Sequence, residues 1–136
     1  MLGKTRRPEF RAMIDDYAKR IGHHAAIEVV EVRHTDASLK KLAIDRAATA
    51  ILLDAGGKPF DSEALAKWLG NHRDRGTRDL IFICGDAGGF PEGFAERANL
   101  KLSLSAMTFS HELARVMLAE QLYRAFAILS GAPYPK

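Results

Sequence analysis

The segment Leu80-Ile81-Phe82-Ile83-Cys84-Gly85-Asp86-Ala87-Gly88-Gly89 decides the fold of this chain. An apolar run that stops abruptly at a glycine-rich loop is typical of a buried strand followed by a tight turn. A second run, Leu100-Lys101-Leu102-Ser103-Leu104-Ser105, lies downstream after a short helical piece, and a long helix follows it. This order predicts one edge of an open α/β sheet. Such sheets bind ligands beyond the carboxyl ends of their strands, so we expect the two loops to line one pocket.

The residues upstream predict alternating helices and strands. Apolar spacing, caps and breakers indicate helices at 8–21, 36–47 and 62–76, strands at 26–32, 48–54 and 79–84, and a loop at 55–59. Helices that alternate with short apolar strands predict an α/β fold, a mostly parallel sheet with helices on both faces. No repeat or linker divides the chain, so we expect residues 1–136 to form a single domain.

Composition narrows the class of protein. The 136 residues are 47% hydrophobic and 27% charged, which is ordinary for a soluble globular domain. The start has no apolar run of a secretory signal, and no stretch approaches the ~18 apolar residues of a membrane span, so we expect a cytoplasmic protein. The single cysteine excludes an intrachain disulfide and a multi-cysteine metal site. A net charge of +3 permits an anionic partner without requiring one.

The final helix, expected at 110–130, carries apolar side chains on nearly all sides. Such a helix is buried on more than one side. In a domain of this size, a second copy of the chain can cover one of those sides, and the alternative is a central helix in a monomer. We favour the homodimer, and both arrangements remain open.

Several familiar motifs fail on single residues. Gly56-Gly57-Lys58 is not a phosphate-binding loop, because Pro59 replaces the magnesium-binding Ser or Thr. His111 begins a helix as in zinc proteases, but Arg115 replaces the second His, so we expect no metal site. Cys84, at a strand end, is expected to be a small buried residue rather than a nucleophile.

Glu120 and Arg124 are four residues apart on the last helix and are expected to form an ion pair. The pair either only stabilises the helix or holds Arg124 ready for an anionic ligand. Spacing alone favours the first interpretation.

Longer strings in the C-terminal third resemble one known family. Leu102–Phe109, His111, Glu120–Ala125 and Pro133-Tyr134 match, in order, the ribosomal RNA large subunit methyltransferase H family, of the SPOUT class. Leu53-Asp54 with Gly56–Lys58, Ile83–Gly85, Gly3-Lys4 and the first helix match as well, so the resemblance covers almost the whole chain.

The resemblance implies an enzyme that uses S-adenosylmethionine to methylate N3 of a pseudouridine in 23S rRNA. It also implies a homodimer whose C-terminal part forms a trefoil knot. Among the residues of this chain, it implies cofactor contacts from Leu53, Cys84, Gly85, Leu104, Ser105, Ala106, Met107, Thr108 and Phe109. It places Arg124 and Tyr134 beside the reacting base as the catalytic residues. Lys4, Arg6, Arg7 and Lys136 are basic residues that can contact the phosphates of the RNA.

Two positions depart from the family pattern. Cys84 stands where the family usually has a glycine, and Pro135 stands where it usually has a histidine. They leave a second interpretation open, a catalytically weakened relative that still binds RNA or the ribosome. The order of strands and helices alone would also fit a flavodoxin-like domain that binds a small molecule.

Overall fold

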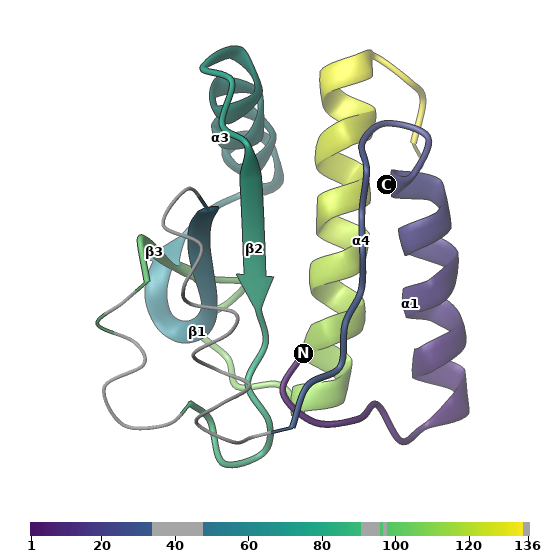
Figure 1. Ribbon diagram of the computed structural model, residues 1–136, viewed down its shortest axis with the longest axis vertical. Coiled ribbons are helices and arrows are strands. Elements are labelled where there is room, and N and C mark those ends of the chain that lie inside the picture. The colour runs from purple at the N-terminus through teal and green to yellow at the C-terminus, as the bar shows by residue number, and fades with distance from the viewer. Residues whose placement is uncertain (34–47, 91–95, 97, 135–136) are drawn as a thin grey trace.

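The computed structural model describes residues 1–33, 48–90, 96 and 98–134 (Figure 1). The helix predicted at 36–47, most of the short helical piece expected after Gly89, and the residues Pro135 and Lys136 lie outside this part of the chain.

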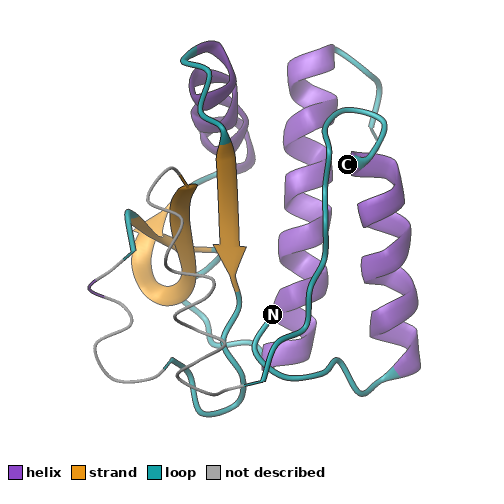
Figure 2. Cartoon of the chain, viewed as in Figure 1, coloured by secondary structure: helices purple, strands orange, loops and turns teal. Residues whose placement is uncertain are grey.

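The described elements follow the predicted alternation of helices and strands (Figure 2). They are α1 (Pro8–Ile21), β1 (Ala48–Pro59), α3 (Ser62–Asp74), β2 (Asp79–Ile83), β3 (Leu100–Ser103) and α4 (His111–Ser130). The strands form one sheet in the order β2-β1-β3, and both pairings are parallel. The prediction of an α/β fold with a parallel sheet is therefore confirmed.

Local signals set the ends of the helices. Pro8 occupies the first turn of α1. The Asp61 carboxylate caps α3 by accepting a hydrogen bond from the Ala64 N–H at 2.7 Å, and Ser110 caps α4 in the same way. Gly131 ends α4 with a φ of 74°, a left-handed conformation that favours glycine. These ends agree with the predicted ones to within about two residues.

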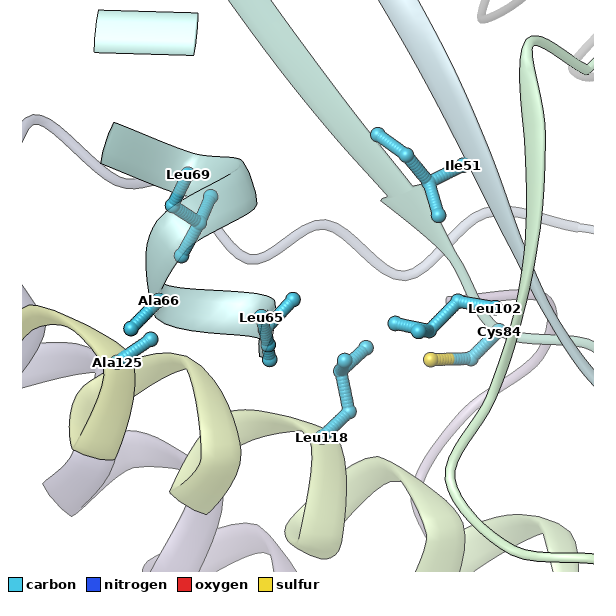
Figure 3. Close-up of a cluster of buried hydrophobic side chains, with 8 residues drawn as sticks. All are labelled: Ile51, Leu65, Ala66, Leu69, Cys84, Leu102, Leu118 and Ala125. Atoms are coloured by element: carbon cyan, nitrogen blue, oxygen red, sulfur yellow. The ribbon is translucent and has the colours of Figure 1, made fainter. Parts of the chain in front are cut away.

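One face of the sheet packs against α3 and α4. Side chains from the three strands and the two helices meet in a single core cluster (Figure 3). Its buried members are Ile51, Leu65, Ala66, Leu69, Cys84, Leu102, Leu118 and Ala125. Helix α4 also packs against α1, so α1 and α3 cover two of its sides within one chain. Its apolar sequence is thus partly explained without a second copy.

The opposite face of the sheet has a smaller cluster. Leu52 and Ile83 point to this face, where Leu2 covers them together with partly buried Val32 and Phe90. Alternate residues of β1 and β2 thus serve opposite faces, as expected for a sheet buried on both sides. No described helix lies in this cluster, and the helix predicted at 36–47 is outside the described residues. Helices on both faces therefore stay a prediction.

Two local predictions are wrong. Residues 26–32 form an extended segment rather than a strand, because only Val32 forms a bridge, to Leu2, within the described chain. Residues 55–59 were expected to be a loop but belong to β1. After a register shift, Lys58 and Pro59 pair again with Leu102 and Ser103 of β3. Glycine and proline indicated a loop, yet the second pairing with β3 returns them to the sheet.

The close approach of β1 to β3 makes a prediction about Gly57. A Cβ atom on Gly57 would lie 2.6 Å from the backbone oxygen of Lys101, whereas one on Gly56 would lie 3.7 Å from the nearest atom, Asp54 Oδ1. We expect Gly57→Ala to lower the free energy of unfolding by about 2 kcal/mol through overpacking. We expect the matched Gly56→Ala to change it by less than about 1 kcal/mol. Urea unfolding measures both, and equal effects would contradict this packing.

Candidate functional site

The residues that the sequence assigns to cofactor binding begin at the same edge of the sheet. Leu53 lies on β1, Cys84 and Gly85 follow β2, and Leu104–Phe109 follow β3. Leu52 pairs with Ile83 and Leu53 pairs with Leu102, so the three segments leave the sheet at one level. In a parallel sheet, this carboxyl edge is where ligands bind. The structure therefore brings the three predicted segments to a common place.

Cys84 contributes backbone rather than its side chain to this edge. Its side chain is 3% exposed and its sulfur points into the core cluster (Figure 3). Burial raises the pKa of the Cys84 thiol, so the thiol stays protonated at neutral pH. The Cys84 carbonyl oxygen accepts a hydrogen bond from the Leu2 N–H at 2.9 Å. The prediction of a small buried residue is confirmed.

The loop after β2 is a tight turn built on glycines. The Gly89 N–H donates to the Asp86 carbonyl oxygen at 3.0 Å, and the Gly88 N–H donates to the Asp86 carboxylate at 2.8 Å. A Cβ on Gly85 would lie 3.0 Å from the Gly89 carbonyl oxygen. The turn therefore presents backbone groups with little side chain over them, which suits close contact with a ligand.

A buried serine that the sequence analysis did not single out joins the second half of β1 to the loop after β3. The Ser103 hydroxyl lies 3.0 Å from the carbonyl oxygens of both Ala55 and Ser105. This contact turns the chain, so β3 ends at Ser103 rather than at the predicted Ser105. A polar residue inside an apolar run was the signal that would have identified it.

The segment after β3 combines one anchored residue with several exposed ones. Leu104 packs against the core cluster, and the Ser105 hydroxyl accepts a hydrogen bond from the Met107 N–H at 3.1 Å. Ala106 and Thr108 are exposed, and Met107 is 72% exposed. The exposed apolar side chain of Met107 is available to a ligand or to another protein chain.

The two residues assigned to catalysis lie together near the far end of α4. The Arg124 guanidinium lies 4.5 Å from the centre of the Tyr134 ring, and its Nε donates to Glu120 Oε1 at 2.8 Å. The predicted ion pair is therefore confirmed. Tyr134 also packs edge-on against Tyr123, with ring centres 5.0 Å apart. Burial raises the pKa of Tyr134 to about 12, and a hydrogen bond with Tyr17 contributes to the shift.

Within one chain, these catalytic candidates do not meet the cofactor segments. Helix α4 begins at His111, two residues after Phe109, and Arg124 lies 13 residues farther along the helix. At 1.5 Å per residue, that separation is about 20 Å along the helix. Figure 1 shows the start of α4 at the end of the molecule where β2 terminates, and the chain after α4 at the opposite end. Within one chain, the residues predicted to bind the cofactor and the residues predicted to act in catalysis thus form two separate groups, which we call the two predicted half-sites.

Two other kinds of feature, a metal-binding cluster and a membrane-spanning helix, are absent from the part of the chain that the structure describes. The described residues contain no group of three or more His, Cys, Asp or Glu side chains that could hold a metal ion. None of the helices in the described ranges is long and apolar enough to span a bilayer.

Comparison with known proteins identifies the family. A family model described as "Predicted SPOUT methyltransferase" matches residues 1–135. The chain belongs to the SPOUT methyltransferase family. A protein of Pelobacter propionicus named "Ribosomal RNA large subunit methyltransferase H" is 42% identical, with 98% of this chain and 94% of that protein aligned. A protein of the same name from Koribacter versatilis is 42% identical over 98% of this chain and 92% of its own length.

This membership bears out two expectations from the sequence. The resemblance to the methyltransferase H family is confirmed, and so is the expectation of an enzyme that transfers methyl groups. The flavodoxin-like interpretation is set aside, because a SPOUT model accounts for almost the whole chain. The individual site residues stay predictions.

The burial of Cys84 predicts its reactivity. Only the thiolate attacks a disulfide reagent, and burial both disfavours the thiolate and blocks access. We expect the native thiol to react with Ellman's reagent at least about 100-fold more slowly than the same thiol in urea. We also expect the native rate to rise only as the pH exceeds the usual thiol pKa. A native rate equal to the rate in urea would place the sulfur in the loop rather than in the core.

Proposed function

We propose that this SPOUT methyltransferase uses S-adenosylmethionine to methylate N3 of a pseudouridine in 23S rRNA. The observation that carries the proposal is that the second half of β1 meets the loops after β2 and β3 at one sheet edge, in a chain aligned over 98% of its length with proteins named for rRNA methylation. The net charge of +3 is compatible with a polyanionic substrate. We also propose that the enzyme is cytoplasmic and that it has the trefoil knot of its class.

The residues at the sheet edge fit such a donor. The turn from Gly85 to Gly89 offers backbone groups that can hydrogen-bond to polar edges of the donor, and the Cys84 side chain is turned into the core. Partly buried Leu53 and Leu104 offer apolar surface for a flat ring, and Ser105–Phe109 supply further backbone. When bound, the donor supplies an electrophilic sulfonium methyl group.

The protein must then orient the base and allow N3 to lose its proton. Because the pKa of Tyr134 is about 12, its hydroxyl keeps its proton at neutral pH and serves as a hydrogen-bond donor rather than as a base. The positive charge of Arg124 stabilises the negative charge that develops on the ring as water takes the N3 proton. Glu120 fixes the direction of the guanidinium. As the new N3–methyl bond forms, the sulfur–methyl bond breaks.

A homodimer reconciles this chemistry with the two separate half-sites. In a closed two-fold dimer, each chain can place its Arg124 and Tyr134 over the loops of the other. Exposed apolar side chains are available for such an interface, including Met107 at the cofactor edge and Ile128 on α4, which is 44% exposed.

The weakened relative that binds RNA without efficient catalysis is the competing proposal. This interpretation was based on two departures from the family pattern, at Cys84 and Pro135. The burial of the Cys84 side chain removes one of its two supports, because no side chain is added to the loop where a donor would bind.

The proposed activity is tested on ribosomal particles from a bacterial strain that lacks its own enzyme of this type. With radiolabelled S-adenosylmethionine, we expect about one methyl group per 23S rRNA, at N3 of a pseudouridine, and none on particles from the parent strain. Calorimetry with S-adenosylhomocysteine, the donor without its methyl group, separately measures whether the donor site binds its ligand. Donor binding without methyl transfer would favour the weakened relative, and absence of both would contradict the proposal.

The shared site is tested by complementation between two inactive variants. Tyr134→Phe removes the hydroxyl, and Gly85→Val forces a side chain against Gly89; we expect each alone to lower activity by about 100-fold. Co-expressed variants form mixed dimers in which one of the two sites is intact, so activity should recover to about a quarter of the wild-type value. A mixture no more active than its two components would show that each chain works alone.

A further inference from the structure

The N-terminal residues before α1 are fastened to the edge of the sheet that carries the cofactor loops. The Leu2 N–H donates to the Cys84 carbonyl oxygen at 2.9 Å, and the Gly3 N–H donates to the Val32 carbonyl oxygen at 2.8 Å. Gly3 also lies beside Asp86 of the glycine turn, where an added Cβ would be 4.0 Å from the Asp86 Cβ. Figure 1 shows this part of the chain passing the start of α4 before it enters α1.

A buried arginine on α4 holds the first part of this segment. Arg115 has no solvent-exposed surface, and its guanidinium donates to the carbonyl oxygens of Leu2 and Gly3 and, at 2.9 Å, to the Thr5 hydroxyl. Burying a charge is costly unless it finds hydrogen-bond partners. These contacts engage both terminal nitrogens of Arg115, while its Nε has no hydrogen-bond partner within the described residues. Three contacts to residues 2–5 therefore tie the position of this segment to α4.

A glutamate one turn earlier on α4 holds the second part. Glu112 Oε1 accepts hydrogen bonds from the backbone N–H of Arg6 at 2.7 Å and of Arg7 at 3.0 Å. The Arg7 N–H, with a further contribution from Arg6, lowers the pKa of Glu112 and keeps it a carboxylate at neutral pH. The contact goes to the backbone, so the two guanidinium groups are not used in it.

The segment held in this way presents three cations to solvent. Lys4, Arg6 and Arg7 are exposed. The described residues give Lys4 and Arg6 no ion pair, and the contact of Arg7 with Glu9, at 3.9 Å between two exposed side chains, is weak. Exposed cations can bind the phosphates of a nucleic acid. Because the backbone that carries them is already ordered, binding loses less conformational entropy.

We propose that Lys4, Arg6 and Arg7 form the RNA-docking segment of this enzyme and that α4, through Arg115 and Glu112, fixes this segment beside the cofactor loops. The inference rests on the proposed function and names the surface that receives the phosphates of its RNA substrate. Arg115 and Glu112 are positioning residues, because they act on the RNA only through the backbone of the segment.

Charge removal tests the docking surface. The variant Lys4→Gln/Arg6→Gln/Arg7→Gln is compared with Arg73→Gln/Arg75→Gln/Arg78→Gln, which removes the same charge from exposed positions around the end of α3. We expect the first variant to raise both the KM for rRNA particles and the Kd for a 23S rRNA fragment at least about tenfold. In a plot of log Kd against the logarithm of the salt concentration, the slope for this variant should be smaller by about 2 than the slope for the wild-type protein. The control should stay within about twofold, and donor affinity should be unchanged in both.

A variant of Glu112 distinguishes a positioning role from a purely electrostatic one, because the two roles predict opposite changes in RNA affinity. Glu112→Ala removes a negative charge near the cations, so electrostatics alone would tighten RNA binding. If Glu112 holds the segment, the same change should weaken RNA binding about threefold to tenfold. Glu63→Ala removes an equivalent charge from the first turn of α3 and should have little effect.

The outcomes distinguish this inference from the proposed function. If the wild-type protein transfers no methyl group, the proposed function fails, and the Kd for the RNA fragment still tests the docking segment. If the wild-type protein is active but the N-terminal variant binds RNA as the control does, the docking segment is wrong. If Glu112→Ala binds RNA more tightly, the positioning role is wrong.

Discussion

Parallel pairing of β1 with both β2 and β3 is the interaction on which the rest of this structure depends. Because the three strands point the same way, the chain leaves all of them at one edge, and Leu53, Cys84 and Leu104 arrive there together. The apolar runs that form the strands also fix how the strands pair. Ile51 and Leu102 are buried in the core beneath α3 and α4, whereas Leu52 is buried on the opposite face of the sheet. Burial of both faces of the sheet thus determines where the loops at its carboxyl edge lie. In our proposal, these loops bind the methyl donor.

Helix α4 connects two groups of residues to which our proposal gives different roles. Near its start, Arg115 and Glu112 hold the N-terminal segment beside the glycine turn. Near its end, Glu120 and Tyr134 surround Arg124. Along α4, about 20 Å separates His111, which follows the predicted cofactor segment, from Arg124, so the two predicted half-sites do not meet within one chain. In our proposal, a second chain solves this problem, and the apolar surface left on α4 serves that contact.

Much of the fold was predictable because its signals are local. Asp61, Ser110 and Gly131 mark helix ends by their own capping chemistry, and the strands of the sheet are recognisable as short apolar runs. Pairing over long distances was not predictable: residues 26–32 have the composition of a strand but find only one bridge, and β1 continues past its glycines because β3 accepts it again.

The candidate site was predictable only in part, for a similar reason. The family resemblance supplies residues but not their arrangement, so it did not reveal that Tyr134 and the segments predicted to bind the cofactor are separate within one chain. Ser103 and Arg115 were missed because a serine in a strand and an arginine in a helix look ordinary until their burial is known. Both are buried, at 2% and 0% exposure, and both join distant segments.

The most direct test of the central claim is amide hydrogen exchange with and without S-adenosylhomocysteine. If the second half of β1 and the loops after β2 and β3 bind the donor, protection should appear in residues 54–58, 84–89 and 103–109. Amides in the second half of α3, such as Leu69, should be unchanged. The claim would be contradicted if the ligand bound tightly but protected none of these three segments, or protected only other parts of the chain.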